Sequence, residues 1–511
     1  MYLHILSDGR SGQISFAEGQ TLLDAIRAQE GFPIHAPCGS NGTCGKCTVC
    51  LVTEAGETPV LACRTRAEDG MTVRLPSQAP LSVELGGFLT YPSDPGLQGY
   101  GIACDIGTTT VVCHLVDLSS GTVTAAVGEG NAQRPNGSDV IARIKASMDG
   151  LRPALTAAIL RQLSGMIHAL CHQTGIPLDR IHGMAVAANT TMLHLLTGLP
   201  PDSLGVAPFT PLSLFGTCQD AHDMGLPFDG TVYLAPAVSG YVGGDITADL
   251  LATDMDRMEK PVLLIDVGTN GEMVLGCKEH FLCCSTAAGP AFEGAQIRFG
   301  MTAAAGAISQ VRYADGQLIC TVLGGGAPQG ICGSGLIDAI AVMLSLGAME
   351  ETGRLLDADE DEIPPAAQPY LTVLDDAPAF RLSGDICVTQ ADVRKVQLGK
   401  GAISAGITVL RSSYGDAEGP ISALLLSGGF GSYIRPESAA RIGLIPADLL
   451  PVTRAVGNTA AQGAAKALVS ASARQRLSAL QRNLEYKELS MLPEFNDAYL
   501  DAMLFPQEDQ S

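Results

Sequence analysis

Two segments of the sequence repeat one pattern about 160 residues apart. Residues 101–116 read GIACDIGTTTVVCHLV, and residues 262–276 read VLLIDVGTNGEMVLG. Each is an apolar run, then Asp-x-Gly-Thr, then a second apolar run, which predicts two strands joined by a tight turn. A repeat at this distance indicates two similar subdomains, each opening with such a hairpin. Strand-like and helical runs alternate from there to about residue 470, which is typical of an α/β fold.

Both turns have the residue types that bind phosphate. Glycine in a tight turn exposes backbone N–H groups, and hydroxyls add further donors. The candidate nucleotide contacts are Gly107, Thr108, Thr109 and Thr110 in the first turn and Gly268, Thr269 and Asn270 in the second. Asp105 and Asp266 suit Mg²⁺, which proteins usually hold with one or two carboxylates plus phosphate. A single turn of this kind also makes ordinary hairpins, whereas two facing turns can grip one phosphate chain from both sides.

A third glycine-rich loop follows a buried strand in ISALLLSGGFGSYI. Side chains larger than glycine would block a nucleoside that lies on the backbone of this loop. Gly428, Gly429 and Gly431 are therefore candidate nucleotide contacts next to Ser427. The alternative is a close crossing between a helix and a strand.

The first 78 residues hold a cysteine cluster with the spacing C-x5-C-x2-C-x15-C. Its members are Cys38, Cys44, Cys47 and Cys63. Glycines inside the loop let the backbone turn toward a metal cluster, so the four thiolates can converge on one iron–sulfur cluster. A zinc site or buried structural thiols are the alternatives. Cys50 lies in a strand-like run and is expected to be a core thiol.

Upstream of the cysteines, the runs LHIL and QISF flank a turn and predict a hairpin. Thr21 with Asp24 three residues later predicts the start of a helix.

Composition excludes some classes of function. The net charge is −22, which argues against a nucleic-acid or anionic-membrane partner. No basic stretch followed by an apolar run opens the sequence, and the longest uncharged stretch is broken by Pro328 and glycines. A soluble, cytoplasmic protein is therefore expected. The 15 cysteines then read as free thiols or metal ligands.

Two resemblances follow from these motifs. Residues 1–78 resemble ferredoxin domains of the plant or adrenodoxin type, which implies a β-grasp fold and a 2Fe–2S cluster on the four cysteines. The later elements resemble, in their order, the acetate and sugar kinase/Hsp70/actin superfamily. That implies a two-subdomain actin-like (RNase H-like) ATPase in which Asp105 and Asp266 hold Mg²⁺ and the attacking water. Asp245 would be a further carboxylate near the γ-phosphate, although a GGD sequence also caps helices. Glu293 and Lys400 are candidate nucleotide contacts, with a solvated or capping role as the alternative.

Further segments narrow the match over nearly the whole chain. They are NAQRPNGSDVIARI, AANTTMLHLLTGLPP, AAGPAFEGAQIRFGM, GICGSGLID and ELSMLPEFNDAYLDAMLFP. With the ferredoxin front end, they resemble the reductive activators of corrinoid proteins. The resemblance implies one-electron transfer from the 2Fe–2S cluster to cob(II)alamin, with ATP and Mg²⁺, to regenerate cob(I)alamin for methyl transfer. It implies a corrinoid methyl-carrier protein and a low-potential electron donor as partners, and it allows a homodimer.

The predicted organisation has five parts. They are a ferredoxin-like domain (1–78), a linker (79–99), subdomain I (100–258), subdomain II (259–470) and a C-terminal helical tail (471–511). Two other functions remain open from the residues alone. One is a small-molecule kinase with a redox-sensing ferredoxin domain. The other is an electron carrier whose actin-like domain binds partners without hydrolysing ATP. Turnover of the kinase would depend on a small acceptor, and the carrier would not respond to ATP.

Overall fold

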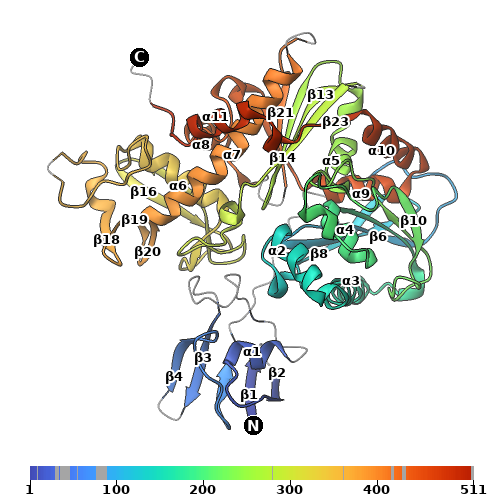
Figure 1. Cartoon of the computed structure of the whole chain (residues 1–511), viewed down its shortest axis with the longest axis horizontal. Helices are drawn as coiled ribbons and strands as arrows, with labels where there is room; N and C mark the ends of the chain where they lie inside the picture. Colours follow the sequence, from blue (N-terminus) through green and yellow to red (C-terminus); the bar gives the residue numbers. More distant parts are fainter. Residues whose placement is uncertain are drawn as a thin grey trace.

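The structure is a computed structural model of the whole chain. The structure describes residues 1–7, 10–28, 34, 47–53, 56–75, 89–278, 280–360, 362–415, 419–428 and 433–507. Figure 1 shows a small N-terminal sheet domain and two larger α/β lobes, which correspond to subdomains I and II.

The N-terminal domain is a five-stranded sheet against which α1 packs. The sheet has the order β2-β1-β5-β3-β4, and β1 pairs in parallel with β5 between two antiparallel pairs. This is the predicted β-grasp arrangement. Its elements are β1 (Tyr2–Ser7), β2 (Arg10–Ser15), α1 (Leu22–Arg27), β3 (Thr48–Thr53), β4 (Gly56–Leu61) and β5 (Thr72–Arg74). The predicted helix start is confirmed, because Thr21 and Asp24 form a capping box.

Subdomain I is built on a six-stranded sheet with the order β10-β11-β9-β6-β7-β8. Its strands are β6 (Tyr100–Ile106), β7 (Thr110–Asp117), β8 (Thr122–Gly130), β9 (Ile181–Ala188), β10 (Thr217–Asp220) and β11 (Thr231–Leu234). Its α-helices are α2 (Val140–Ala146), α3 (Arg152–Thr174), α4 (Thr190–Thr197) and α5 (Gly244–Thr253). The helix α3 buries Leu155, Ile159 and Leu163, whose spacing of four residues makes one apolar face.

Subdomain II repeats the order of five of these strands and adds its sixth strand at the opposite edge. Its main sheet has the order β22-β21-β12-β13-β14-β23, with β12 (Val262–Val267), β13 (Gly271–Cys277), β14 (His280–Thr286), β21 (Ala423–Ser427), β22 (Thr453–Gly457) and β23 (Leu484–Tyr486). Both main sheets contain an antiparallel hairpin, a third antiparallel strand, and a first strand that pairs in parallel with a later one. The duplication predicted from the two hairpins is therefore confirmed.

The rest of subdomain II surrounds this sheet. Two smaller sheets contain β15 (Ala307–Ala314), β16 (Gln317–Val322) and β17 (Gly330–Ile331), and β18 (Leu371–Leu374), β19 (Ala377–Ser383) and β20 (Ile386–Thr389). The α-helices are α6 (Gly333–Ser345), α7 (Gln390–Tyr414), α8 (Pro436–Arg441) and α9 (Thr459–Val469).

The helices α5 and α9 cross closely between the two main sheets. A Cβ atom at Gly463 would lie only 2.1 Å from the carbonyl oxygen of Ala248, so the crossing needs glycine at this position. Packing of α9 against β6 and β9 ties the end of subdomain II to the sheet of subdomain I.

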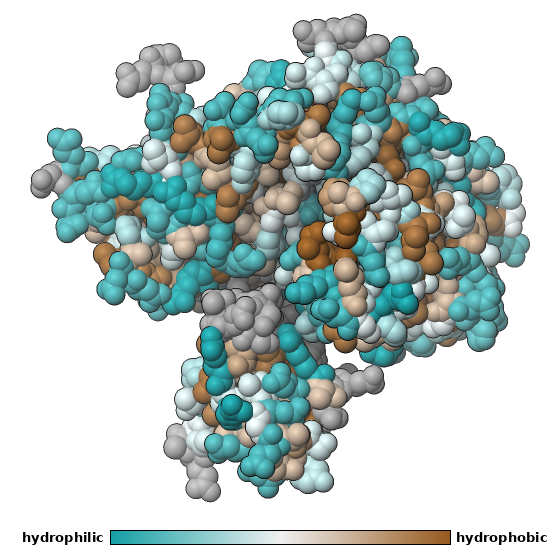
Figure 2. Space-filling view, in the orientation of Figure 1, coloured by the Kyte–Doolittle hydropathy of each residue, from teal (hydrophilic) through white to brown (hydrophobic). Residues whose placement is uncertain are grey.

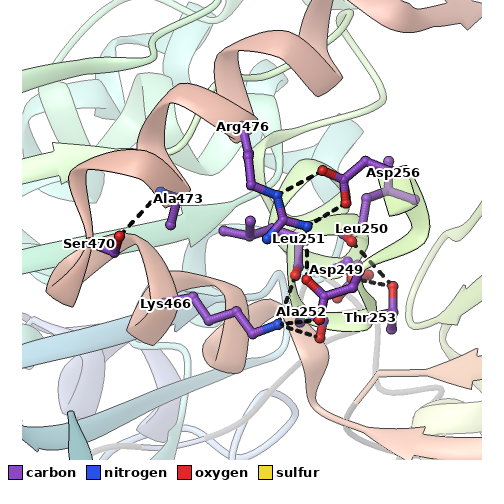
Figure 3. A network of polar contacts seen from close by, with 11 residues as sticks. Asp249, Leu250, Leu251, Ala252, Thr253, Asp256, Lys466, Ser470, Ala473 and Arg476 are labelled. Carbon is purple, nitrogen blue, oxygen red and sulfur yellow. Dashed lines mark hydrogen bonds and ion pairs between the residues drawn. The ribbon is translucent and has the colours of Figure 1, made fainter. Parts of the chain in front are cut away.

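A polar network holds the C-terminal end of α5 (Figure 3). Lys466 Nζ donates to the carbonyl oxygens of Leu251 and Ala252 at 3.0 and 2.9 Å. Arg476 donates to the carboxylates of Asp254 and Asp256. Cations at this end of a helix stabilise its unpaired carbonyl groups, so α9 and the following helix fix the position of α5.

The segment predicted as a helical tail contributes to both subdomains. The helix α10 (Ala471–Asn483) packs on α5 and α9, β23 pairs with the edge strand β14, and α11 (Pro493–Asp501) packs on α7. Phe505 is 2% exposed, so the chain stays anchored beyond α11.

One helical stretch among the described residues, Val140–Thr174, is long and apolar enough to cross a membrane by length and composition. It bends at Gly150, where φ is 93°, and α3 packs against β7, β8 and α4. Figure 2 shows hydrophilic side chains over most of the visible face, with a hydrophobic group near its middle.

Candidate functional site

The two Asp-x-Gly-Thr turns face each other across the two subdomains. Thr109 Oγ1 lies 3.1 Å from Thr269 Oγ1, although the residues are 160 positions apart in the sequence. Each turn is tight, because the amide of Gly107 donates to the Thr110 carbonyl and the amide of Gly268 donates to the Asn270 carbonyl, both at 2.9 Å. The structure therefore brings the predicted phosphate contacts of both turns together.

Glu293 joins the two turns. It ends the short 3-10 helix Pro290–Glu293, and its carboxylate accepts hydrogen bonds from Thr109 Oγ1 and, at 2.8 Å, from Thr269 Oγ1. An anionic group thus already lies between the turns, held by one hydroxyl from each subdomain. The structure places Glu293 at the site, as predicted for a nucleotide contact.

A cluster of buried carboxylates lies beside the turns. Asp105 is near the end of β6, Asp266 near the end of β12, and Asp245 in the first turn of α5. Burial, together with the charge of Asp245, raises the pKa of Asp105 to about 7, although a hydrogen bond from Asn458 opposes the shift. Burial also raises the pKa of Asp245 to about 6. The pKa of Asp266 is raised well above its ordinary value by burial and then by the charges of Asp245 and Asp105.

The carboxylate cluster extends to two residues that the sequence reasoning missed. Burial and neighbouring anions raise the pKa of Asp249 and of Glu272 well above their ordinary values. Glu272 lies opposite Asp266 in the ladder of β12 and β13, so its place directly after the second turn was the available signal. Asp249 comes from the middle of α5 and accepts from Thr459 Oγ1 at 2.6 Å, a contact that the sequence does not indicate.

These residues fit a magnesium ion. The mutual repulsion of several buried carboxylates is relieved by a cation, and the Oδ2 atom of Asp249 is buried without a hydrogen-bond partner in the described part of the chain. Among the described residues no three ligand side chains form a ready-made metal cage. Mg²⁺ usually takes one or two carboxylates and completes its shell with phosphate and water.

Buried polar side chains support the first turn from behind. Arg143 of α2 is fully buried, and its guanidinium donates to the carbonyl oxygens of Gly137 and Thr108. Asn131 Nδ2 donates to the Gly107 carbonyl at 2.8 Å, and Asn189 Nδ2 donates to Thr108 Oγ1 at 3.1 Å. Arg143 and Asn131 lie in NAQRPNGSDVIARI and Asn189 in AANTTMLHLLTGLPP, so these motifs stabilise the shape of the turn.

The third glycine-rich loop begins beside Asp266. Gly428 has φ of +99°, and a Cβ atom there would lie 2.4 Å from Asp266 Oδ1, so only glycine fits. Gly429 and Gly431 lie outside the described residues, and their predicted contacts with the nucleotide stay predictions.

The prediction for Lys400 is corrected by the structure. Its side chain is buried against the C-terminal segment, where Nζ donates to the Leu504 carbonyl and lies 4.8 Å from the centre of the Phe505 ring. The reason is local packing: Lys400 lies on α7, and residues 502–507 fold over that helix. Lys400 is therefore an anchor of the C-terminus, and the structure does not bring it together with the turns.

Burial lowers the pKa of Lys400 from its ordinary value of 10.5 to about 8. Between pH 8 and 10.5 the unfolded chain binds this proton and the folded chain does not, so stability rises with pH in this window. Relative to Lys400→Met, the free energy of unfolding of the wild type should rise by up to about 3 kcal/mol between pH 8 and 10.5. Melting temperatures of both proteins between pH 7 and 10.5 measure this, and parallel curves would contradict a buried, titrating lysine.

Two of the four predicted cluster ligands lie in the described part of the N-terminal domain. Cys47 and Cys63 are buried, and their Sγ atoms are 3.3 Å apart. Cys38 and Cys44 lie outside the described residues. The two converging thiols fit an iron–sulfur cluster at this end of the sheet. Cys50 is half-buried on β3 and lies outside the core cluster that contains Val49, so the expectation of a core thiol was wrong.

Three family models match the chain. Residues 5–68 match a 2Fe-2S iron-sulfur cluster binding domain, residues 100–258 the RACo middle region, and residues 260–511 the C-terminal domain of RACo, the ASKHA domain. The cofactors of the chain are thus a 2Fe–2S cluster and ATP with Mg²⁺.

Individual proteins agree with these models. The corrinoid activation enzyme RamQ of Eubacterium limosum is 31% identical, over 95% of this chain and 96% of its own. A reductase of a Co(II) methylated amine-specific corrinoid protein from Methanosarcina barkeri is 26% identical, over 78% and 76%. A solved structure of a reductive activator for a corrinoid, iron-sulfur protein superposes with a TM-score of 0.74 at 28% identity, over 99% of each chain. The chain therefore belongs to the family of reductive activators of corrinoid proteins.

Proposed function

We propose that this enzyme transfers one electron from its 2Fe–2S cluster to cob(II)alamin of a corrinoid methyl-carrier protein and couples the transfer to ATP hydrolysis. The cluster loses one electron and the cobalt gains it, so that Co(II) becomes Co(I). Cob(I)alamin is then available for methyl transfer. The names of the relatives, which refer to corrinoid activation and to a Co(II) corrinoid protein, support the class of substrate.

The observation that carries the proposal is the pair of facing turns in the same chain as an iron–sulfur domain. Thr109 and Thr269 come from different subdomains and share the Glu293 carboxylate. A phosphate chain bound there contacts both subdomains at once, so its arrival and hydrolysis change how they sit together. A partner bound across both subdomains therefore responds to the nucleotide.

The turns and the carboxylate cluster have different roles toward ATP. The turns donate N–H and O–H groups to phosphate oxygens, and the carboxylate cluster holds the ion and orients the attacking water. Mg²⁺, when bound, neutralises phosphate charge. Asp105 and Asp245, with pKa values of about 7 and about 6, lie in the range in which a carboxylate accepts a proton near neutral pH.

An energetic argument supports the coupling. One-electron transfer that is uphill by about 200 mV costs close to 5 kcal/mol, since about 59 mV corresponds to about 1.4 kcal/mol. A change of conformation driven by nucleotide can supply that amount. The exposed hydrophobic side chains of subdomain I, among them Ile141, Met148, Val206 and Leu212, suit contact with a protein partner. A low-potential electron donor, a cytoplasmic location and a homodimer belong to the same proposal.

The test follows the absorbance change of cobalt from Co(II) to Co(I) under strict anaerobiosis. The full-length protein, a corrinoid protein and a low-potential reductant are mixed with and without ATP. We expect cobalt reduction only when ATP is present, and we expect the iron–sulfur cluster to be reduced in both mixtures.

Other outcomes point to other functions. Equal reduction of cobalt without ATP would indicate an electron carrier whose actin-like domain does not drive the electron transfer. ATP turnover that depends on a small alcohol or acid, with no effect on cobalt, would indicate a kinase.

A further inference from the structure

Arg134 is a cation beside the first phosphate-binding turn, and neither the sequence motifs nor the family comparison assigns it a role. It opens the short 3-10 helix Arg134–Asn136, which directly follows β8. Its amide donates to the Asn131 carbonyl at 3.1 Å, and the amide of Asn131 donates to the Thr109 carbonyl at 2.8 Å. The backbone of Arg134 is therefore fixed to the first phosphate-binding turn.

The side chain of Arg134 is half-buried, and its donors are available for a ligand. A Cβ atom at Gly130 would lie 3.2 Å from Arg134 Nη1, so glycine at that position leaves room for the side chain. Burial lowers the pKa of Arg134, and the negative charge of Glu293 opposes this shift. Within the described residues the guanidinium has no hydrogen bond or ion pair. An arginine that is partly desolvated and keeps its five donors free is suited to an anion.

The neighbouring Arg143 has a different role. Its guanidinium donates to Gly137 O at 3.0 Å, to Gln133 Oε1 at 3.2 Å and to Thr108 O, and it is fully buried. Arg143 thus acts through the backbone of the turn and is a positioning residue. Arg134 is the member of the pair whose donors are available to a ligand.

Glu293 marks where that ligand lies. Its carboxylate is an anion held by the hydroxyls of Thr109 and Thr269, and it is within electrostatic reach of both Arg134 and Arg143. A terminal phosphate has the same charge sign and the same need for hydrogen-bond donors. When a phosphate binds the two hydroxyls in place of Glu293, it comes within the same electrostatic reach of Arg134.

We propose that Arg134 binds the terminal phosphate of ATP and stabilises the charge that develops on it during hydrolysis. This rests on the proposed function, because it requires ATP between the two turns. Water oxygen bonds to the γ-phosphorus as the bond to the β,γ-bridging oxygen breaks. ADP leaves with that oxygen, and the proton of the water ends in solution beside inorganic phosphate. An arginine supplied in this way contributes about 10³-fold or more in phosphoryl transfer.

The test compares Arg134→Ala and Arg134→Lys with the wild type in the full-length protein. We expect kcat for ATP hydrolysis to fall about 10³-fold in Arg134→Ala, with a smaller change in KM, because the contact strengthens in the transition state. Guanidinium ions in solution should partly restore Arg134→Ala. Arg134→Lys should keep intermediate activity, since lysine supplies charge without the planar fork. Arg180→Ala, an exposed arginine of the same subdomain, is the matched control and should retain activity.

A binding measurement separates a chemical role from a structural one. The wild type should bind ADP with aluminium fluoride, which mimics the transferring phosphoryl group, more tightly than ADP alone. Arg134→Ala should lose that difference and keep its affinity for ADP. Unchanged kcat in Arg134→Ala, or a preserved preference for aluminium fluoride, would overturn the inference and leave the proposed function intact. A wild-type protein that neither binds nor hydrolyses ATP would overturn both.

Discussion

Replacing Asp266 by asparagine should lower ATP hydrolysis by about 10³-fold or more. The side chain lies near the end of β12, beside Gly428 and opposite Glu272, where a carboxylate can hold the metal ion and the attacking water. Asparagine has nearly the same shape and lacks the charge. A loss of about 4 kcal/mol in the transition state corresponds to that factor. Steady-state ATPase rates over a range of ATP and Mg²⁺ concentrations measure it.

The same substitution should not weaken the fold. The pKa of Asp266 is raised well above its ordinary value, so its ionised form is costly in the nucleotide-free protein, and removing it should leave the melting temperature equal or higher. Asp179→Asn, at an exposed position of subdomain I, is the matched control and should keep wild-type turnover. Normal hydrolysis by Asp266→Asn would mean that the carboxylate cluster does not serve the ATPase.

The hairpins, the paired sheets and the start of the first helix could be predicted because short stretches of the sequence determine them. Two apolar runs around Asp105 and two around Asp266 gave the hairpins, and their repetition gave the paired sheets. Thr21 and Asp24 gave the start of α1. In each case the residues that decide the structure are close together in the sequence, so propensity, turn chemistry and capping agree with the tertiary fold.

The site was predicted only where its residues lie next to those patterns. Asp249 and Thr459 meet across the crossing of α5 and α9, and no local pattern indicates which helix faces the site. Arginine side chains are mostly exposed, yet Arg143 of α2 is fully buried behind the first turn.

Lys400 shows the opposite error. Lys400 was a candidate nucleotide contact, but the carbonyl group to which its side chain donates comes from a segment 104 residues later. In the N-terminal domain, by contrast, the predicted cluster ligands are cysteines that lie close together in the sequence, so a local pattern again carries the prediction.

Changing Cys63 to serine should abolish or shift the visible spectrum of the 2Fe–2S cluster, and Cys50→Ser should leave it intact. Cys63 Sγ is buried and lies 3.3 Å from Cys47 Sγ, whereas Cys50 lies half-buried on β3, paired with Pro59 and Arg74. Serine oxygen is a harder and poorer ligand for iron than thiolate. Iron content, absorbance and electron paramagnetic resonance of anaerobically purified protein measure the effect. Loss of the cluster in Cys50→Ser alone, or a protein that holds only zinc, would contradict this ligand set.

The two variants together test the division of labour in the chain. Cys63→Ser should still hydrolyse ATP, because its cysteine lies in the N-terminal sheet domain and the turns lie in the two α/β lobes, and it should fail to produce Co(I). Asp266→Asn should keep a reducible cluster and should also fail to produce Co(I). If Cys63→Ser lost ATP hydrolysis while its melting temperature stayed normal, the cluster domain would have to act directly on the nucleotide site. Electron supply and nucleotide chemistry are separable in this fold only if each variant removes one of them and both stop cobalt reduction.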